Sequence, residues 1–351
     1  MRLDLDGLQR EARAVMAPDA FDYYAGGADD EITLAENETA WRRMRLRYRV
    51  LRDVSEVSTR TSVLGSEVSS PVLVAPLAYQ RLAHDEGEAA TARGAAMAGA
   101  LMIVSTLATI ALENVTAAAP DAPRWFQLYV HKDRGWTAEL VDRAVEAGYL
   151  ALMLTVDLPV LGRRRRDERN NFTLPEGMEM ANLGRAMPDV EGSGLASYAT
   201  REIDPSVAFG DIGWFADRSG LPIAVKGIVR GDDALACIDA GASAVSVSNH
   251  GGRQLDTAVA TADALREVAD AVAGAVEIYV DGGIRRGTDV VKALALGARA
   301  VLLGRPVLWG LATGGAEGVG AVLDHLREET ARTLALCGSA SVTDLAPDLV
   351  R

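Results

Sequence analysis

Eight short apolar runs, separated by alanine-rich amphipathic stretches, recur between residues 71 and 305. This repeat constrains the fold more than any other feature of the chain. Continuous apolar runs of this length are typical of strands buried on both faces, as in parallel sheets. The stretches between them have helical spacing and often end in glycine, as helices do. The eight runs are PVLVAP (71–76), ALMIVS (100–105), RWFQLYV (124–130), LALMLTVD (150–157), LPIAVKG (221–227), SAVSVSN (243–249), VEIYVDGG (276–283) and ARAVLLGR (298–305).

Eight strand–helix units in one chain predict a closed (β/α)8 TIM barrel, with an open doubly wound sheet as the alternative. We expect a single domain over residues 1–351, with the barrel at 71–310. Residues 1–70 would form a helical N-terminal segment, and residues 311–351 a C-terminal helical one. The stretch 158–212, after the fourth strand, is far longer than an ordinary connection. Loops of that length are usually functional, so we expect it to be an active-site loop.

The charge and the cysteines exclude several classes of function. The net charge of −13 argues against a nucleic-acid partner, which requires a basic surface. Cys237 and Cys337 have no metal-ligand spacing, so we expect no metal site, no disulfide framework and a cytoplasmic location. No apolar run reaches the ~18 residues of a membrane helix, so no membrane partner is expected. An anionic substrate would therefore have to be attracted by a local cationic pocket.

Polar residues follow every predicted strand, at the end where such barrels place their active sites. At the last two strands, DGGIRRGTDV and LLGRP combine glycines with arginines. Glycine lets backbone N–H groups approach an anion, and the following helix N-terminus adds its dipole. We therefore predict a phosphate site here. Two tight turns without a ligand are the alternative.

The motif SNHGGRQLD (248–256) places His250 at a strand end with Arg253 three residues later. A lone histidine is more often structural, but histidine is also the natural general base near neutral pH. Arginine presents a planar fork that grips a carboxylate. Asp157 ends another strand and either orients the imidazole or caps a helix. We interpret RRRRDERN (163–170) as a solvated loop from which one arginine reaches the pocket.

From FDYYAGGADDE to GRPVLWGLA, nearly the whole chain resembles the FMN-dependent 2-hydroxy-acid oxidases and dehydrogenases. That family includes glycolate oxidase, lactate oxidase and mandelate-oxidising enzymes. The resemblance rests on SNHGGRQLD, LTVD followed by GRR, FQLY, PIAVKG, DGGIRRGTDVVKALALGA and GRP. It implies FMN as cofactor, oxidation of an (S)-2-hydroxy acid to the 2-oxo acid, and a homotetramer or homo-octamer.

The resemblance also assigns roles by position. His250 would be the base, paired with Asp157, and Tyr129 would hydrogen-bond the substrate hydroxyl or carboxylate. Arg164 and Arg253 would bind the carboxylate. The substrate-binding residues implied are Tyr23, Tyr79, Leu107, Tyr129, Arg164 and Arg253. The flavin would be held by Pro76, Leu77, Ala78, Ser105, Gln127, Thr155, Lys226 and Ser248, with its phosphate at Asp281, Gly282, Gly283, Arg285, Gly304 and Arg305.

Three positions refine the expected reaction. Ala78 is alanine in many oxidases of the family and glycine in some membrane-bound mandelate dehydrogenases, which favours O2 as acceptor and H2O2 as product. Leu107 stands where plant glycolate oxidases have tryptophan and leaves room for a larger substrate. The stretch PLAYQRLAHDEGE, which contains Tyr79, resembles 4-hydroxymandelate oxidases, whose matching stretch has Ala-Tyr where glycolate oxidases have Ala-Met. Those oxidases, however, have phenylalanine at the position of Tyr23. We therefore expect an aromatic, mandelate-like substrate ahead of an aliphatic one.

Three other functions stay open at this point. A dehydrogenase would pass the electrons to a quinone or a cytochrome. A flavoenzyme of another class would have no need of a carboxylate clamp. A non-catalytic phosphate-binding barrel would be colourless when purified, because it would hold no flavin.

Overall fold

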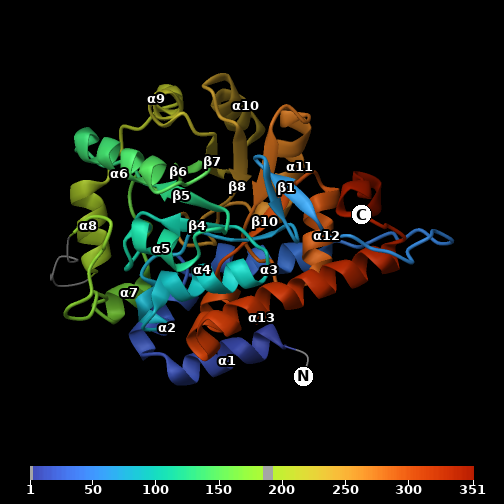
Figure 1. The fold of residues 1–351 in the computed structure, drawn as a ribbon, viewed down its shortest axis with the longest axis horizontal. Helices are drawn as coiled ribbons and strands as arrows, with labels where there is room; N and C mark the ends of the chain where they lie inside the picture. Colours follow the sequence, from blue (N-terminus) through green and yellow to red (C-terminus); the bar gives the residue numbers. More distant parts are fainter. Residues whose placement is uncertain (1–2, 185–192) are drawn as a thin grey trace.

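A computed structural model describes residues 3–184 and 193–351. Eight parallel strands close into a barrel in the order β10-β3-β4-β5-β6-β7-β8-β9 (Figure 1). Because β10 pairs with β3, the sheet has no edge, so the (β/α)8 prediction is confirmed and the open sheet is excluded. Each strand overlaps its predicted run. The strands are β3 (Val72–Val74), β4 (Met102–Ser105), β5 (Arg124–Leu128), β6 (Leu152–Thr155), β7 (Ile223–Ile228), β8 (Ala244–Val247), β9 (Glu277–Val280) and β10 (Ala300–Leu303).

The strands are continuously apolar because alternate side chains enter two different cores. Leu73, Ile103 and Trp125 point into the barrel, where all three are fully buried. Their strand neighbours, such as Val72 and Phe126, pack outward against the surrounding helices. Burial on both faces therefore explains why no polar alternation marks these strands in the sequence.

Helices cover the outside of the barrel between successive strands (Figure 1). The last one, α13, is interrupted at Gly314 and Gly315, whose backbone angles are not helical. Its first part follows β10, and α13 also contacts α1, α4 and α12. The covering helices are α4 (Gly87–Met97), α5 (Leu112–Ala118), α6 (Arg134–Glu146), α9 (Gly210–Ser219), α10 (Gly231–Asp239), α11 (Thr261–Val272), α12 (Gly287–Ala295) and α13 (Arg305–Cys337).

The N-terminal segment is helical only in its first part. It begins with α1 (Leu5–Val15), α2 (Pro18–Ala25) and α3 (Ile32–Arg43). Residues 44–60 instead run as an extended arm. A hairpin follows, made of β1 (Thr61–Val63) and β2 (Ser66–Val68). Val63 and Val68, one from each strand, are buried against the barrel interior, so the hairpin covers one end of that core.

The long stretch after β6 contains two short helices, α7 (Arg165–Arg169) and α8 (Gly194–Glu202). The α7 helix is part of the run that we interpreted as a solvated loop. Ion pairs of Arg165 with Asp30 and of Arg166 with Glu31 connect this helix to the N-terminal segment. The acidic stretch MPDVEGSG begins at residue 187 and falls largely outside the described residues. Within the described part of the chain, none of the helices is long and apolar enough to cross a membrane.

Candidate active site

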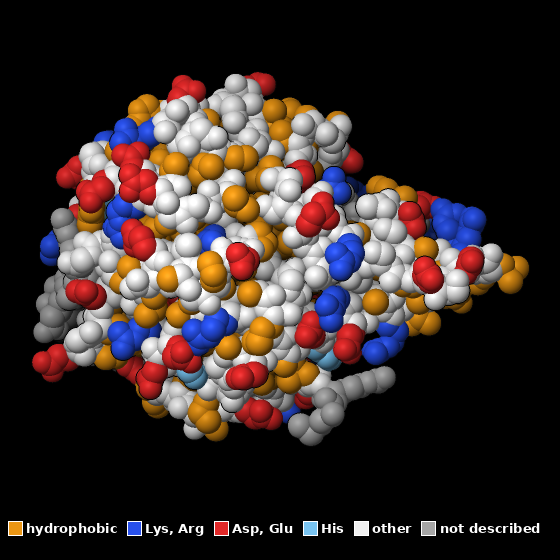
Figure 2. All heavy atoms as spheres, viewed as in Figure 1, with side chains coloured by type: hydrophobic (Ala, Val, Ile, Leu, Met, Phe, Trp, Pro, Cys, Tyr) orange, Lys and Arg blue, Asp and Glu red, His pale blue; other side chains and the backbone are white. Residues whose placement is uncertain are grey.

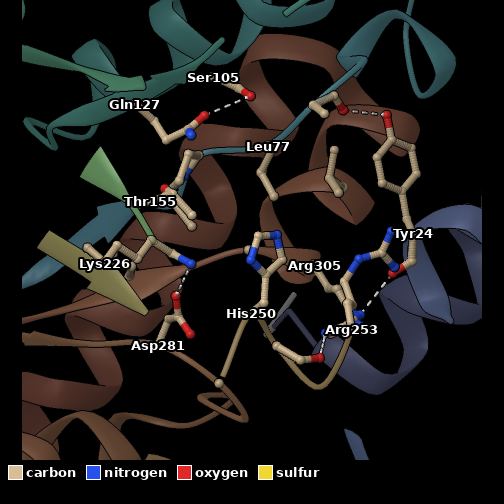
Figure 3. Close-up of a pocket in the computed structure, with 18 of the residues that line it drawn as sticks. Tyr24, Leu77, Ser105, Gln127, Thr155, Lys226, His250, Arg253, Asp281 and Arg305 are labelled. Carbon is tan, nitrogen blue, oxygen red and sulfur yellow. Dashed lines mark hydrogen bonds and ion pairs between the residues drawn. The ribbon is translucent and has the colours of Figure 1, made fainter. Parts of the chain in front are cut away.

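A pocket lies at the carboxyl ends of the barrel strands, and most of the predicted site residues line it (Figure 3). Residues from the ends of all eight strands reach it, joined by Tyr23 from α2 and Arg164 from the loop after β6. The predicted residues in the lining are Tyr23, Pro76, Leu77, Ala78, Ser105, Leu107, Gln127, Tyr129, Thr155, Arg164, Lys226, His250, Arg253, Asp281, Gly282, Gly283, Arg285, Gly304 and Arg305.

His250 is held by hydrogen bonds on both its ring and its backbone. Its Nδ1 lies 2.7 Å from Asp157 Oδ1, and its Nε2 lies 3.5 Å from the Tyr129 hydroxyl. Because a carboxylate only accepts, Nδ1 carries the proton and Nε2 keeps its lone pair on the pocket side. The backbone of His250 is left-handed, with φ of 57°, a conformation that persists in a non-glycine residue only when its surroundings fix it.

The protonation states of this pair suit a general base. Burial lowers the pKa of His250, and the nearby Asp157 carboxylate only partly opposes that shift. Burial alone would raise the pKa of Asp157, but His250 and Lys226 outweigh it, and the net shift is downward. At neutral pH the pair is therefore a neutral imidazole beside an ionised carboxylate. That carboxylate can stabilise the imidazolium formed when a proton is taken up.

Two arginines form the cationic side of the pocket. The Arg253 guanidinium lies 4.8 Å from the centre of the Tyr23 ring. Its Nη1 donates to the carbonyls of Tyr23 (2.6 Å) and Gly26 (2.8 Å). Arg164 is buried, and burial together with the charge of Arg253 lowers its pKa. Two guanidinium groups whose charges repel each other in one pocket favour a bound anion, and their planar donors match a carboxylate.

The residues expected to hold the flavin ring fit that group. Gln127 Nε2 and Thr155 Oγ1 are buried and have no hydrogen-bond partner among the described residues. Such orphaned atoms are rare unless a ligand or water completes them. Lys226 stays charged, because Asp281 and Asp157 overcome the effect of burial and raise its pKa. Donors and a cation around a pocket with apolar walls suit the polar edge of a flavin.

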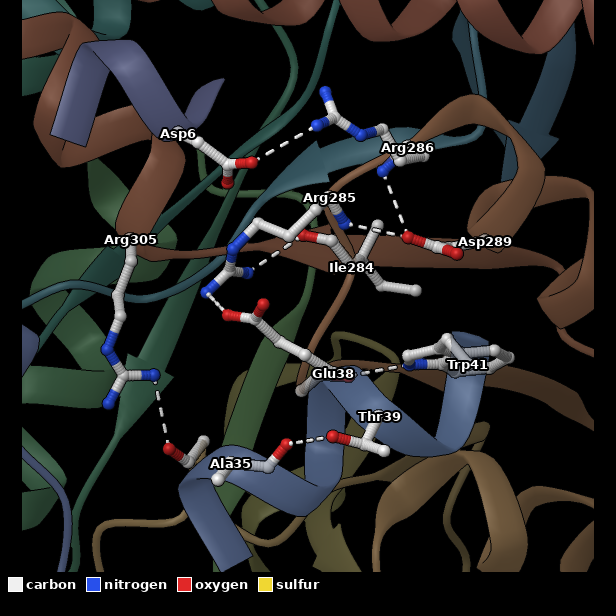
Figure 4. A network of polar contacts seen from close by, with 12 residues as sticks. Asp6, Ala35, Glu38, Thr39, Trp41, Ile284, Arg285, Arg286, Asp289 and Arg305 are labelled. Atoms are coloured by element: carbon white, nitrogen blue, oxygen red, sulfur yellow. Dashed lines mark hydrogen bonds and ion pairs between the residues drawn. The ribbon is translucent and has the colours of Figure 1, made fainter. Parts of the chain in front are cut away.

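The turn after β9 has the geometry of a phosphate site. Gly282 and Gly283 have φ of 90° and 81°, which side-chain-bearing residues rarely adopt. A Cβ on Gly283 would lie 2.1 Å from the Asn37 carbonyl oxygen, so only glycine fits there. Arg285 is paired with Glu38 at 2.9 Å (Figure 4). Arg305 is held by the carbonyls of Tyr24, Gly26 and Gly251.

Three predicted residues lie outside the lining. Tyr79 is fully buried, and its left-handed backbone (φ of 57°) directs its hydroxyl to Met180 Sδ, 3.8 Å away. It packs behind Tyr23, with 5.7 Å between the ring centres. Asp157 contacts His250 through the hydrogen bond to Nδ1. The Ser248 hydroxyl accepts from Lys226 Nζ (2.9 Å) and from the N–H of His250 (3.0 Å), and donates to Asp281.

Sequence reasoning missed several residues of the site. The Tyr24 hydroxyl donates to the carbonyls of Tyr79 (2.6 Å) and Ala78 (3.1 Å), and its position next to Tyr23 was the available signal. Gln254, inside the motif that we singled out, donates to the Asp157 carbonyl at 2.8 Å. The apolar lining carried no chemical signal in the sequence. It includes Leu158, Leu161, Leu195, Ile284 and Leu308.

A barrel rim that brings together a buried histidine–aspartate pair, two arginines and a glycine-rich turn fits the flavin-dependent oxidoreductases that act on small anionic substrates. The chain belongs to the FMN-dependent dehydrogenase family, whose profile matches residues 12–351. L-Lactate oxidase from Nostoc sp. is 51% identical, over 98% of this chain and 96% of the relative. 2-Hydroxyacid oxidase 1 from Homo sapiens is 46% identical, over 99% and 96%.

Solved structures of mandelate oxidase share the fold. One of them, with (S)-4-hydroxymandelic acid, has a TM-score of 0.93 at 42% identity and covers 99% of this chain and 98% of that one. With the family match, these similarities identify the protein as an FMN-dependent enzyme of the 2-hydroxy-acid oxidase family.

Proposed function

We propose that the protein oxidises a bulky or aromatic (S)-2-hydroxy acid to the 2-oxo acid and passes the electrons to O2, giving H2O2. The observation that carries this proposal is the convergence of two pairs on one pocket. His250 with Asp157 provides a base, and Arg253 with Arg164 provides a carboxylate seat. Ala78 lines the same pocket and supports O2 as the acceptor.

The chain's own residues divide the work of the reaction. Arg253 and Arg164 bind the substrate carboxylate and orient the α-carbon. His250 Nε2 accepts a proton from the substrate, and Asp157 stabilises the resulting imidazolium. Tyr129, whose hydroxyl already lies 3.5 Å from Nε2, donates to the substrate oxygen. FMN, when bound, supplies the two-electron acceptor, and Lys226 places a positive charge beside it.

Four leucines that line the pocket support a bulky substrate. They are Leu107, Leu158, Leu161 and Leu195. Apolar walls with a few polar groups select ligands by size and shape. The mandelate oxidase structures support an aromatic acid. The 51% identity to an L-lactate oxidase favours the second candidate, a small aliphatic acid.

Replacing Leu107 with tryptophan is expected to narrow the substrate range. The indole would fill space that a phenyl group needs, while glycolate would still fit. We expect kcat/KM for (S)-mandelate to fall about 10- to 100-fold relative to glycolate, the scale of discrimination by pocket volume. Leu336→Trp, on an exposed part of α13, is the control. An unchanged ratio of kcat/KM for mandelate to kcat/KM for glycolate would show that Leu107 does not contact the substrate.

Asp157→Asn is expected to lower kcat on the order of 10²-fold, because an amide cannot stabilise the imidazolium. It should also move the pH profile. The carboxylate raises the pKa of His250. Without it that pKa falls further, so the acidic limb of kcat/KM shifts to lower pH. The measurement is kcat/KM as a function of pH for both enzymes. An acidic limb at higher pH in Asp157→Asn would contradict this account of the pair.

Oxygen uptake by the purified enzyme tests the acceptor and the substrate together. The panel contains glycolate, lactate, long-chain 2-hydroxy acids and both mandelate enantiomers. We expect the fastest uptake with (S)-mandelate, with one H2O2 formed per O2 consumed. Turnover only with artificial dyes would support a dehydrogenase instead. Faster uptake with lactate than with mandelate would support the aliphatic candidate.

We also propose a homotetramer or homo-octamer, supported by the arm at residues 44–60, which extends from the body (Figures 1 and 2). Tyr48, Val50 and Leu51 are 69%, 67% and 101% exposed, and apolar side chains gathered on one projecting segment favour contact with another chain. Light scattering is expected to show a tetramer or octamer that Tyr48→Ser with Leu51→Ser dissociates. A monomeric wild-type protein would contradict it.

We propose the cytoplasm as its compartment. Cys237 and Cys337 are both free and buried, as expected of a protein kept in a reducing environment. Fractionation of the source cells tests this, and recovery outside the cytoplasm would contradict it.

A further inference from the structure

Helix α3 packs against two turns of the active site, although none of its described side chains lines the pocket. On one side, a Cβ on Gly252 would lie 2.6 Å from the Leu34 nitrogen. On the other side, a Cβ on Gly283 would lie 2.1 Å from the Asn37 carbonyl oxygen. Both contacts join backbone to backbone. The helix therefore fixes the distance between the turn that carries His250 and the turn expected to bind the flavin phosphate.

A reciprocal pair of buried amides joins α3 to the first of these turns. Asn37 Nδ2 donates to Asn249 Oδ1 at 2.9 Å, and Asn249 Nδ2 donates to Asn37 Oδ1 at 2.8 Å. The two residues are 1% and 6% exposed. Asn249 also donates to the Val259 carbonyl and accepts from the N–H of Gly252. Its side chain therefore spans the turn that holds His250 in its left-handed conformation.

The same helix reaches the second turn. Trp41 Nε1 donates to the Gly282 carbonyl at 2.8 Å, and Glu38 is paired with Arg285 (Figure 4). Asn37 Oδ1 also accepts from the N–H of Thr261 at 3.3 Å. The hydroxyl of Thr261 in turn donates to the Asp281 carbonyl. Asn37 is thus the residue of α3 that bonds toward both turns.

We propose that Asn37 is a positioning residue that couples the flavin-phosphate turn to the base-bearing turn through Asn249. The conformation of His250 depends on its surroundings, and the amide next to it is fixed by Asn37. A fixed conformation of either turn therefore stabilises the conformation of the other. This inference rests on the proposed function in taking His250 as the base.

The test is Asn37→Ala, studied in the FMN-loaded enzyme with rates normalised to bound flavin. We expect anaerobic flavin reduction by (S)-mandelate to slow by roughly tenfold or more, because a buried amide loses its partner. The KM should change little, because Asn37 does not touch the substrate. The Kd for FMN should rise in the same variant. Hydrogen exchange should accelerate in both residues 248–256 and residues 281–286.

Thr39→Ala is the matched control, since Thr39 is exposed on the same helix and its hydroxyl bonds only within α3. It should leave the reduction rate, the Kd for FMN and both exchange rates unchanged. Asn37→Ala and Asn249→Ala should be non-additive in a double-mutant cycle, because they remove the same pair. If Asn37→Ala does not fold, the isosteric Asn37→Asp, which cannot donate to Asn249, replaces it with the same expected directions.

Two results would overturn the proposal. One is a wild-type Kd for FMN together with a wild-type reduction rate per bound flavin in the Asn37 variant. The other is faster exchange confined to α3, with both turns unchanged. The exchange and FMN-binding measurements do not depend on the role of His250. A failure of the proposed base would therefore be distinguished from a failure of this coupling.

Discussion

Replacing His250 with glutamine is expected to leave FMN bound and to slow flavin reduction by the substrate about 10²- to 10⁴-fold, the usual contribution of a positioned general base. Glutamine keeps a polar side chain of similar reach but cannot accept a proton near neutral pH. Burial lowers the pKa of His250, so the wild-type base is already neutral at pH 7. Glutamine has no titratable group, so raising the pH should not restore the variant.

The measurement is stopped-flow reduction in the absence of oxygen, which separates the substrate step from the oxygen step. His325→Gln is the control, because His325 lies in α13 and pairs with Glu329 rather than with any pocket residue. It should reduce at the wild-type rate. Reduction of the His250→Gln enzyme at that rate would show that another group takes the proton.

The second large effect is expected for Arg253→Lys. Lysine keeps the charge but replaces a bidentate fork with a single point of donation. It also loses the contact with the Tyr23 ring and the bonds to the carbonyls of Tyr23 and Gly26. Charge-assisted hydrogen bonds contribute about 1.5–3 kcal/mol each, so we expect the KM or substrate Kd to rise roughly 10- to 100-fold.

This variant should separate binding from chemistry. At saturating substrate, kcat is expected to fall less than kcat/KM, because the base and the flavin site stay in place. Arg165→Lys is the matched control, since Arg165 pairs with Asp30 on the surface of the same region. A normal KM in Arg253→Lys would mean that Arg164 alone seats the carboxylate.

The barrel was predictable because its strands are buried on both faces and leave continuous apolar runs in the sequence. That His250, Arg253 and Asp157 lie near one another could also be predicted, because parallel strands bring their carboxyl ends to one rim of the barrel. The Asn37–Asn249 pair was not, since 212 positions separate its members and neither residue type signals a long-range contact. Tyr79 was expected among the substrate-binding residues because its stretch resembles 4-hydroxymandelate oxidases. The sequence does not show that its backbone is left-handed or that its hydroxyl lies near Met180.

Other parts of the site depended on packing. The sequence does not show which leucines of the stretch after β6 line the pocket, because that depends on how the stretch folds over it. In the structure they are Leu158, Leu161 and Leu195. The roles of Gln254 and Asp256 were hidden inside the motif. Gln254 anchors the end of β6, and Asp256 accepts from the N–H groups of Asp30 and Thr33. Much of SNHGGRQLD therefore holds the turn that carries His250 rather than lining the pocket.

The most direct test of the central claim is an anaerobic mixing experiment with the purified, flavin-containing protein and (S)-mandelate. We predict that the visible absorbance of the flavin is lost as the 2-oxo acid forms in a one-to-one ratio, and that it returns when O2 is admitted, with release of H2O2. A flavin that stays oxidised in the presence of mandelate, lactate, glycolate and the long-chain 2-hydroxy acids would contradict the account.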